Sequence, residues 1–180
     1  MRVAPAILLP VALGAVLSFA QDAHPHDAQP SSAGAGSGYV HVHKFDPNRD
    51  AVADIRAAVV EARRTGKRII LDIGGDWCQY CHQMDQFFHE HDDVLQIRDK
   101  DFITVEVYYG RDNKNQEALA RYSKILGVPH FFVLESDGTL LYSQHVRDLR
   151  SGAGTYDTQK MKEFLLKWAP PALERTATER

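Results

Sequence analysis

The fold of this chain is decided by the stretch Trp77-Cys78-Gln79-Tyr80-Cys81-His82, which contains both cysteines of the 180 residues. Two cysteines separated by two residues can form a dithiol redox centre. When a histidine follows directly, the same spacing also matches the attachment site of a c-type haem. The motif alone leaves both interpretations open, so the residues on either side of it must separate them.

The segment before the motif is predicted to be a helix followed by a buried strand. Asp50 is a candidate N-cap for a helix of about fifteen residues, which Thr65-Gly66 ends. Lys67–Ile73 is a largely apolar run with Asp72 as the ionisable group near its end, a pattern typical of a buried strand. Gly74-Gly75-Asp76 then forms the short connection to the motif.

The segment after the motif alternates between helical and extended patterns. These patterns predict helices over 78–88, 94–98, 116–125 and 157–168, strands over 102–109, 131–134 and 139–143, and a tight turn over 136–138. Val128-Pro129 stands directly before one of the strands. This alternation of helices and strands predicts an α/β fold.

The first twenty residues have the organisation of a secretory signal peptide. Arg2 precedes an apolar run from Ala6 to Phe19, and small residues stand where a signal peptidase cleaves. The run of about fourteen residues is shorter than the roughly 20 that span a bilayer, which disfavours the alternative of a membrane anchor. We expect cleavage after Ala20, a flexible leader over 21–45, and a periplasmic or secreted protein that no longer contacts the membrane.

Composition favours one small exported domain. The length after cleavage suits a single core, predicted over 46–169, with a frayed tail over 170–180. The formal net charge of -3, without long blocks of one sign, gives no footprint for nucleic acid or for an anionic membrane. One close cysteine pair points to a chemical use rather than to a disulfide scaffold. We expect a monomer without a cofactor or a bound metal.

The residues around the motif can be assigned roles from their positions. Unpaired backbone N–H groups at a helix N-terminus stabilise a thiolate, so Cys78 is the expected nucleophile. Cys81, one turn later on the same face, would resolve the mixed disulfide. Asp72, in apolar surroundings, would have a raised pKa and could accept or return the proton of Cys81. Alternatively, Asp72 only caps a turn at the end of its strand.

The order of the elements resembles the thioredoxin fold over residues 46–169. The resemblance rests on four features: Trp77 before the first cysteine, Asp72 on the preceding strand, Gly127-Val128-Pro129, and a strand-Asp-Gly-strand hairpin after that proline. The run Gly74–Cys78 is most similar to secreted bacterial proteins close to periplasmic thiol:disulfide interchange domains. The resemblance implies a central mixed β-sheet flanked by helices, with the CxxC at a helix N-terminus.

The resemblance also implies a function and a substrate-binding loop. It implies a thiol-disulfide oxidoreductase that exchanges disulfides with client proteins and depends on an unidentified redox partner. Pro129 would be a cis proline facing the dithiol, and Val128 would offer its backbone N–H and C=O to an extended substrate segment. Trp77 would shield the sulfurs and contact partners, with a place in the core as the alternative.

Three positions depart from the family pattern. Gln79-Tyr80 differs from the dipeptides of cytoplasmic thioredoxins and of strong periplasmic oxidants, so these residues are expected to tune the redox poise, whose direction stays open. Glu106 falls on the strand where many relatives carry a lysine, and a second carboxylate near Asp72 would push one pKa up. His82 either faces solvent or tunes Cys81 electrostatically.

Two other functions fit parts of the sequence. In a c-type haem protein, His82 would be the proximal ligand and Met84, or a later histidine or methionine, the sixth. In a copper-binding module or metallochaperone on the thioredoxin fold, the cysteines and His82, His130 or His145 would bind the metal. The buried strand before the motif disfavours haem, and Asp72 behind the cysteines favours disulfide exchange over a copper site.

Overall fold

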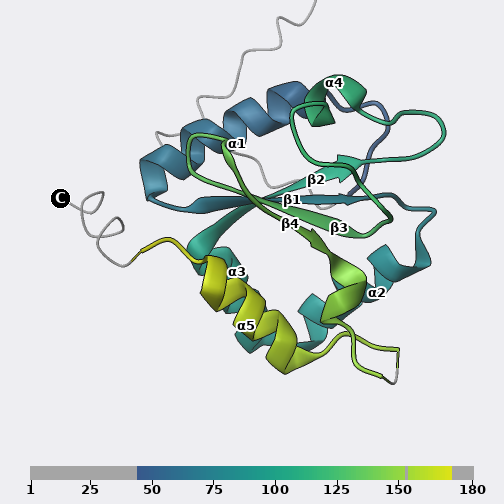
Figure 1. The fold of residues 1–180 in the computed structure, drawn as a ribbon, viewed down its shortest axis with the longest axis vertical. Coiled ribbons are helices and arrows are strands. Elements are labelled where there is room, and N and C mark those ends of the chain that lie inside the picture. Colours follow the sequence, from purple (N-terminus) through teal and green to yellow (C-terminus); the bar gives the residue numbers. More distant parts are fainter. Residues whose placement is uncertain (1–43, 153, 172–180) are drawn as a thin grey trace, which may run out of the picture. The chain divides into compact units, whose positions relative to one another are not determined.

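The computed structural model describes residues 44–152 and 154–171. The signal peptide predicted over 1–20, most of the leader and nearly all of the tail lie outside the described residues, and they stay predictions. Within the described part, a β-sheet carries helices on both of its faces (Figure 1).

The elements alternate along the chain as the sequence predicts. In order they are α1 (Ala51–Thr65), β1 (Arg68–Gly74), α2 (Gln79–Glu90), α3 (Asp92–Asp101), β2 (Phe102–Tyr108), α4 (Gln116–Leu119), β3 (His130–Leu134), β4 (Leu140–His145), the 3-10 helix η1 (Val146–Leu149) and α5 (Thr158–Trp168). The predicted thioredoxin fold, with the CxxC at the start of α2, is confirmed.

The sheet is mixed, with the strand order β2-β1-β3-β4. Strand β1 pairs in parallel with β2 and antiparallel with β3, and β3 pairs antiparallel with β4. The central place of β1 gives Asp72 a neighbour on each side, Glu106 on β2 and Phe131 on β3. The carboxyl group is therefore set into the middle of the sheet.

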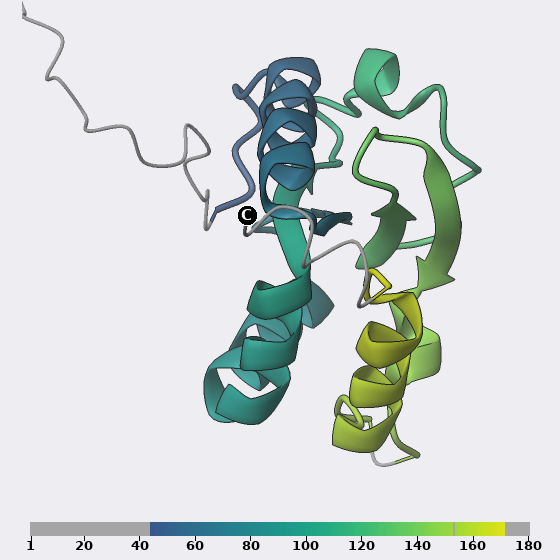
Figure 2. The same cartoon turned by 90° about the vertical axis from the view of Figure 1, so that its left-hand side faces the viewer.

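The helices form one layer on each face of this sheet. Figures 1 and 2 show α1 and α4 on one side and α2, α3 and α5 on the other. Side chains alternate between the faces along a strand. Accordingly, Leu71 of β1 packs in the core cluster that contains Ala58 of α1, and Ile70 packs in the cluster that contains Met84 of α2. By this alternation Asp72 faces the same side as Ile70, toward α2.

Helix α1 begins and ends at the residues that the sequence indicates. The carboxylate of Asp50 accepts hydrogen bonds from the backbone N–H groups of Val52 and Ala53, each at 3.0 Å. Gly66 ends the helix in the left-handed conformation, with φ 65°. A glycine adopts this conformation without the steric cost that a Cβ would add.

The helix predicted over 116–125 is wrong in length, since α4 ends at Leu119. The backbone N–H of Tyr122 donates to the Leu119 carbonyl at 3.0 Å, a three-residue step that is tighter than an α-helical turn. The ring of Tyr122 stacks on Phe132 with centroids 5.3 Å apart. Packing of this ring on the sheet therefore takes the place of further helical turns, and the chain continues irregularly to β3.

Candidate active site

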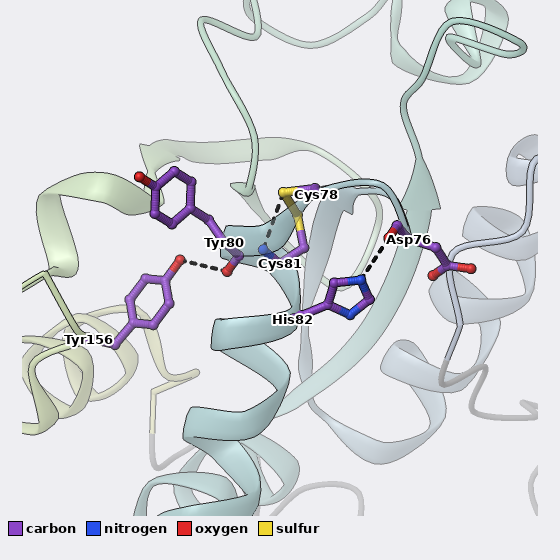
Figure 3. Close-up of a disulfide and its surroundings, with 6 residues drawn as sticks. All are labelled: Asp76, Cys78, Tyr80, Cys81, His82 and Tyr156. Carbon is purple, nitrogen blue, oxygen red and sulfur yellow. Dashed lines mark hydrogen bonds between the residues drawn. A yellow bond between two sulfur atoms is a disulfide. The ribbon is translucent and has the colours of Figure 1, made fainter.

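The two cysteines are bonded to each other at the start of α2. Cys78 is the N-cap residue, with an extended backbone, and its Cα lies 5.2 Å from the Cα of Cys81. The backbone N–H of Cys81 donates to the Sγ of Cys78 at 3.2 Å (Figure 3). The sulfur of Cys78 thus occupies the place where a helix N-terminus stabilises a thiolate.

A close approach at Gly74 fixes the second sulfur against the end of β1. A Cβ at this position would stand 2.8 Å from the Sγ of Cys81 and 2.8 Å from the ring of Phe45. Real Cβ atoms do not come this close to their neighbours, so glycine is required for Cys81 and Phe45 to keep their places. The sequence carries no signal for Phe45, because its contact joins distant parts of the chain.

Cys81 lines a hollow of about 410 Å³, which we call the acidic cavity. Four carboxylate residues line it with Cys81: Asp72, Asp76, Asp85 and Glu106. Asp72 and Glu106 are direct partners in the register of β1 and β2, so their side chains leave the sheet on the same face. Sequence reasoning placed Glu106 near Asp72, and the register confirms it.

Burial raises the pKa of both inner carboxyl groups. Loss of hydration raises the pKa of Asp72 to about 7, with a further increase from Asp85 and an opposing effect of Arg98. The pKa of Glu106 is raised to about 8, first by burial and then by the charge of Asp72. In the described part of the chain, Oδ1 of Asp72 and Oε2 of Glu106 are buried without a hydrogen-bond partner. Either group can therefore change its protonation near neutral pH.

A second hollow, of about 750 Å³, lies beside the motif and is called the Trp77 groove here. Its apolar lining comes from Trp77, the tyrosines at 108 and 109, Ile125, Leu126 and Val128, and three charged residues, Arg111, Asp112 and Lys114, line it as well. Trp77 is 59% exposed and Leu126 is 75% exposed. The alternative that Trp77 belongs to the core is therefore wrong.

The loop before β3 has the backbone that the resemblance implies. The peptide bond between Val128 and Pro129 is cis. Val128 is partly buried and Pro129 is buried, and the Pro129 carbonyl accepts a hydrogen bond from Val146 N–H at 3.4 Å. Val128 lines the Trp77 groove, so the loop and the residue before Cys78 border the same hollow.

The dipeptide between the cysteines is held by a distant loop. The guanidinium carbon of Arg150 lies 4.3 Å from the centre of the Tyr80 ring, and the Tyr156 hydroxyl donates to the Tyr80 carbonyl at 3.0 Å (Figure 3). Arg150 and Tyr156 form an isolated antiparallel bridge with each other. Gln79 is exposed. Local sequence patterns do not reveal these contacts, because Arg150 and Tyr156 lie about seventy residues from Tyr80 along the chain and meet it only in the folded protein.

His82 is exposed, as one of the two sequence interpretations expects. Its Nε2 nevertheless lies 2.6 Å from the carbonyl oxygen of Asp76, and against a carbonyl this nitrogen must be the donor (Figure 3). The side chain therefore braces the loop that leads into Cys78. An electrostatic effect on Cys81 stays a prediction.

The disulfide and the positions of the histidines bear on the two alternative functions, a c-type haem protein and a copper-binding module. A c-type haem would need each sulfur bonded to the porphyrin, whereas here Cys78 and Cys81 are bonded to each other. Over residues 44–152 and 154–171, no three His, Cys, Asp or Glu side chains are grouped so that they could hold a metal ion. His130 is buried, with Nε2 2.8 Å from the Ser143 hydroxyl, and its pKa is lowered to about 4 by burial and by His145.

Known proteins resemble this chain over the same region. Residues 50–136 match a family model described as thioredoxin-like. A segment of 88 residues is 25% identical to the thiol:disulfide interchange protein DsbD of Klebsiella pneumoniae subsp. pneumoniae, covering 49% of this chain and 14% of that protein. The chain thus corresponds to a small part of that curated relative. In the described residues, no helix has the length and apolar character needed to cross a membrane.

Solved structures show the same likeness. A disulphide isomerase from Xylella fastidiosa Temecula1 is 25% identical, with a TM-score of 0.58, over 68% of this chain and 94% of that one. The C-terminal domain of Neisseria meningitidis DsbD in its oxidised form is 24% identical, with a TM-score of 0.48, over 64% of this chain and 94% of that domain. The mixed sheet, the disulfide-bonded CxxC at the start of α2, the match of residues 50–136 to a thioredoxin-like family model and the likeness to the Xylella structure together show that this chain has a thioredoxin fold.

Proposed function

We propose that this chain is an exported thiol-disulfide oxidoreductase that exchanges disulfides with client proteins through Cys78 and Cys81. One observation carries the proposal: the disulfide stands at a helix N-terminus, where the Sγ of Cys78 receives the N–H of Cys81 at 3.2 Å. Loss of the S–S bond would leave a thiolate on Cys78 with that hydrogen bond already in place.

The proposed cycle has two steps in the direction that reduces a client. The Cys78 thiolate attacks one sulfur of the client disulfide, and the other client sulfur leaves as a thiolate that takes up a proton. Cys81 then gives its proton to a carboxylate and attacks the sulfur of Cys78, which releases the second client thiolate. Two electrons pass to the client, and the enzyme is left with the Cys78–Cys81 disulfide seen in the structure.

Asp72 is the proposed acceptor of the Cys81 proton. It shares the acidic cavity with Cys81, and burial raises its pKa to about 7. A group that titrates near neutral pH is half ionised there, so it can accept a proton in one direction of the cycle and return it in the other. An ordinary surface aspartate would remain ionised and would be a poor donor.

Clients are proposed to bind along the Trp77 groove. Trp77 would offer an exposed apolar contact, and the backbone of Val128 before cis Pro129 would pair with an extended client segment. Gln79 and Tyr80 would set the redox poise through the stability of the Cys78 thiolate. The electron donor or acceptor that resets the enzyme is proposed to be another protein.

Export and a monomeric state complete the proposal. The apolar run after Arg2 and the small residues up to Ala20 support a cleaved signal peptide, which would deliver the protein to the periplasm or the medium. A disulfide between the two cysteines is compatible with an exported chain, since disulfides form and persist in oxidising compartments.

The test is to trap clients in the cell. Cys81→Ser leaves the Cys78 nucleophile without its resolving thiol, so mixed disulfides should accumulate in the export compartment and disappear when a reductant is added. Non-reducing gels followed by mass spectrometry of the adducts measure this. Cys78→Ser is the matched control and should trap no clients. Equal adducts in both variants, or a covalent haem absorbance in the purified protein, would contradict the proposal.

A further inference from the structure

Glu106 is a carboxyl group for which the exchange cycle has no role so far. It is the register partner of Asp72 on the neighbouring parallel strand, and both residues line the acidic cavity with Cys81. Neighbouring strands lie about 4.8 Å apart, which brings two carboxyl groups on the same face within reach of each other or of one shared water. The pair therefore stands as a unit beside the resolving cysteine.

The two groups cannot both ionise without cost. One buried oxygen of each, Oδ1 of Asp72 and Oε2 of Glu106, has no hydrogen-bond partner within residues 44–152 and 154–171. Two like charges in a partly desolvated site repel each other. Once one carboxyl group has lost its proton, the other group therefore holds its own proton more tightly. Near neutral pH such a pair retains about one proton between its two members.

Titratable groups from every surrounding element lie around this pair. Arg98 comes from α3, and His82 and Asp85 come from α2. Asp76 lies in the loop before Cys78, Lys44 in the N-terminal segment and Tyr156 in the loop before α5. Arg98 lowers both carboxyl pKa values, but its Nε is bound to Asp99 at 3.0 Å and its guanidinium covers Phe88. The cation is thus shared with other partners, while Asp85 opposes it.

We propose that Asp72 and Glu106 share one proton, and that this pair, rather than Asp72 alone, accepts the proton of Cys81 and returns it when the dithiol re-forms. The pair holds both a carboxylate, which can accept, and a carboxylic acid, which can donate. Glu106 acts on Cys81 through Asp72, so it is a positioning residue for the proton. The proposal rests on the proposed disulfide exchange and extends it by assigning the proton to a pair.

The proton balance of the second step follows directly. The Cys81 S–H bond breaks and the proton passes to the carboxylate of the pair, whose charge falls from minus one to zero. The Cys81 thiolate forms the bond to the Cys78 sulfur, and the client thiolate leaves with the electron pair. The neutral pair then loses one proton through the exposed rim of the cavity, where His82, Asp76 and Asp85 reach solvent.

The first test is the titration of the oxidised protein by carbon NMR of its side-chain carboxyl groups. The wild type should show two coupled carboxyl titrations above pH 6. Glu106→Gln should leave one of them and move the midpoint of Asp72 to lower pH by about one unit, because the like charge is gone. Glu117→Gln, the same change at an exposed position on α4, should leave both titrations unchanged. An Asp72 midpoint that is equal in wild type and Glu106→Gln would overturn the pairing.

The second test follows the reduced protein as it reacts with oxidised glutathione. Acid quenching and mass spectrometry separate the first glutathione release, by Cys78, from the second, by Cys81. Asp72→Asn should slow the second release about a hundredfold, at the lower end of the range of general acid–base catalysis. Glu106→Gln should move the pH midpoint of the second release to lower pH by about one unit, because the like charge beside Asp72 is gone. The double variant should match Asp72→Asn, because Glu106 acts through Asp72. A pH midpoint of the second release that is equal in wild type and Glu106→Gln would overturn the role of Glu106. If wild type released no glutathione at all, the proposed exchange itself would fail, and the NMR titration would still decide the pairing.

Discussion

The two hollows beside the disulfide differ in chemistry, although both border the same six-residue stretch, Trp77–His82. The acidic cavity contains Cys81 and inward-facing carboxyl groups, whereas the Trp77 groove is lined mostly by aromatic and aliphatic side chains, of which Trp77 and Leu126 are exposed. Among the residues that the structure describes, none lines both of them. Under the proposed function this difference is a division of labour, in which the acidic cavity exchanges protons and the Trp77 groove binds the client polypeptide.

The first way to break this comparison is to change the pH at which the protein is unfolded. Asp72 and Glu106 have folded pKa values of about 7 and about 8, whereas both carboxyl groups ordinarily titrate near pH 4. Between about pH 4 and about pH 8 the folded state therefore binds more protons than the unfolded state. Their stabilising effect is complete below about pH 4 and is lost as the pH rises through 7 and 8.

Urea unfolding of the oxidised protein measures this dependence. The unfolding free energy should fall by about 1.4 kcal/mol per pH unit for each carboxyl group that is still protonated only in the folded state. Asp72→Asn with Glu106→Gln should be flatter than wild type from pH 5 to 9, and Trp77→Ala should keep the wild-type slope. A slope shared by all three proteins would place the relevant protons outside the acidic cavity.

The second way is to remove the apolar wall of the groove. Trp77→Ala should slow exchange with a disulfide-bonded polypeptide about tenfold, the size of effect typical of an exposed aromatic that becomes buried on binding. Exchange with oxidised glutathione should change less than about twofold, because a tripeptide dimer covers little of the groove. Stopped-flow rates with both substrates measure the split.

A matched control exists on another face of the molecule. Leu166 on α5 is 59% exposed, the same fraction as Trp77. Leu166→Ala should leave both rates at their wild-type values. If Trp77→Ala slowed glutathione and polypeptide equally, the tryptophan would act on the sulfurs themselves and the division of labour would be wrong.

The smallest expected effect concerns the contact between the motif and the loop before α5. Tyr156→Phe deletes the hydroxyl that donates to the Tyr80 carbonyl at 3.0 Å and leaves the ring in place. The oxidised protein should lose about 1 kcal/mol of unfolding free energy, the usual net contribution of a hydrogen bond. Urea unfolding measures it, with Tyr142→Phe, whose ring stacks on Trp168, as the control. A slower glutathione exchange in Tyr156→Phe would show that the hydroxyl also shapes the reactive site.

Local patterns predicted the elements whose signals lie within a few residues. Asp50 and Gly66 mark the ends of α1 by capping chemistry, and the alternation of helices and strands gave the fold class. The helix after residue 115 was over-extended, because the stacking of Tyr122 on Phe132 depends on where the sheet lies. Helical periodicity cannot register a competing tertiary contact.

The candidate site divides in the same way. Cys78, Cys81 and Asp72 follow from spacing along one strand, loop and helix, and Glu106 followed from the strand that it occupies. Phe45 and Arg150 could not be found, because each reaches the motif from a loop whose own sequence carries no periodic signal. Contacts made by closure of the fold require the fold to be known first.

The hold of Arg150 and Tyr156 on Tyr80 bears on protein engineering. In this protein the dipeptide between the cysteines cannot be exchanged without regard to the rest of the fold. The guanidinium of Arg150 lies over the ring of Tyr80, and the Tyr80 carbonyl accepts a hydrogen bond from the Tyr156 hydroxyl. A dipeptide taken from another oxidoreductase would not be matched to the contacts that Arg150 and Tyr156 make here. A redesign of the reduction potential of this disulfide would therefore have to change positions 79, 80, 150 and 156 together.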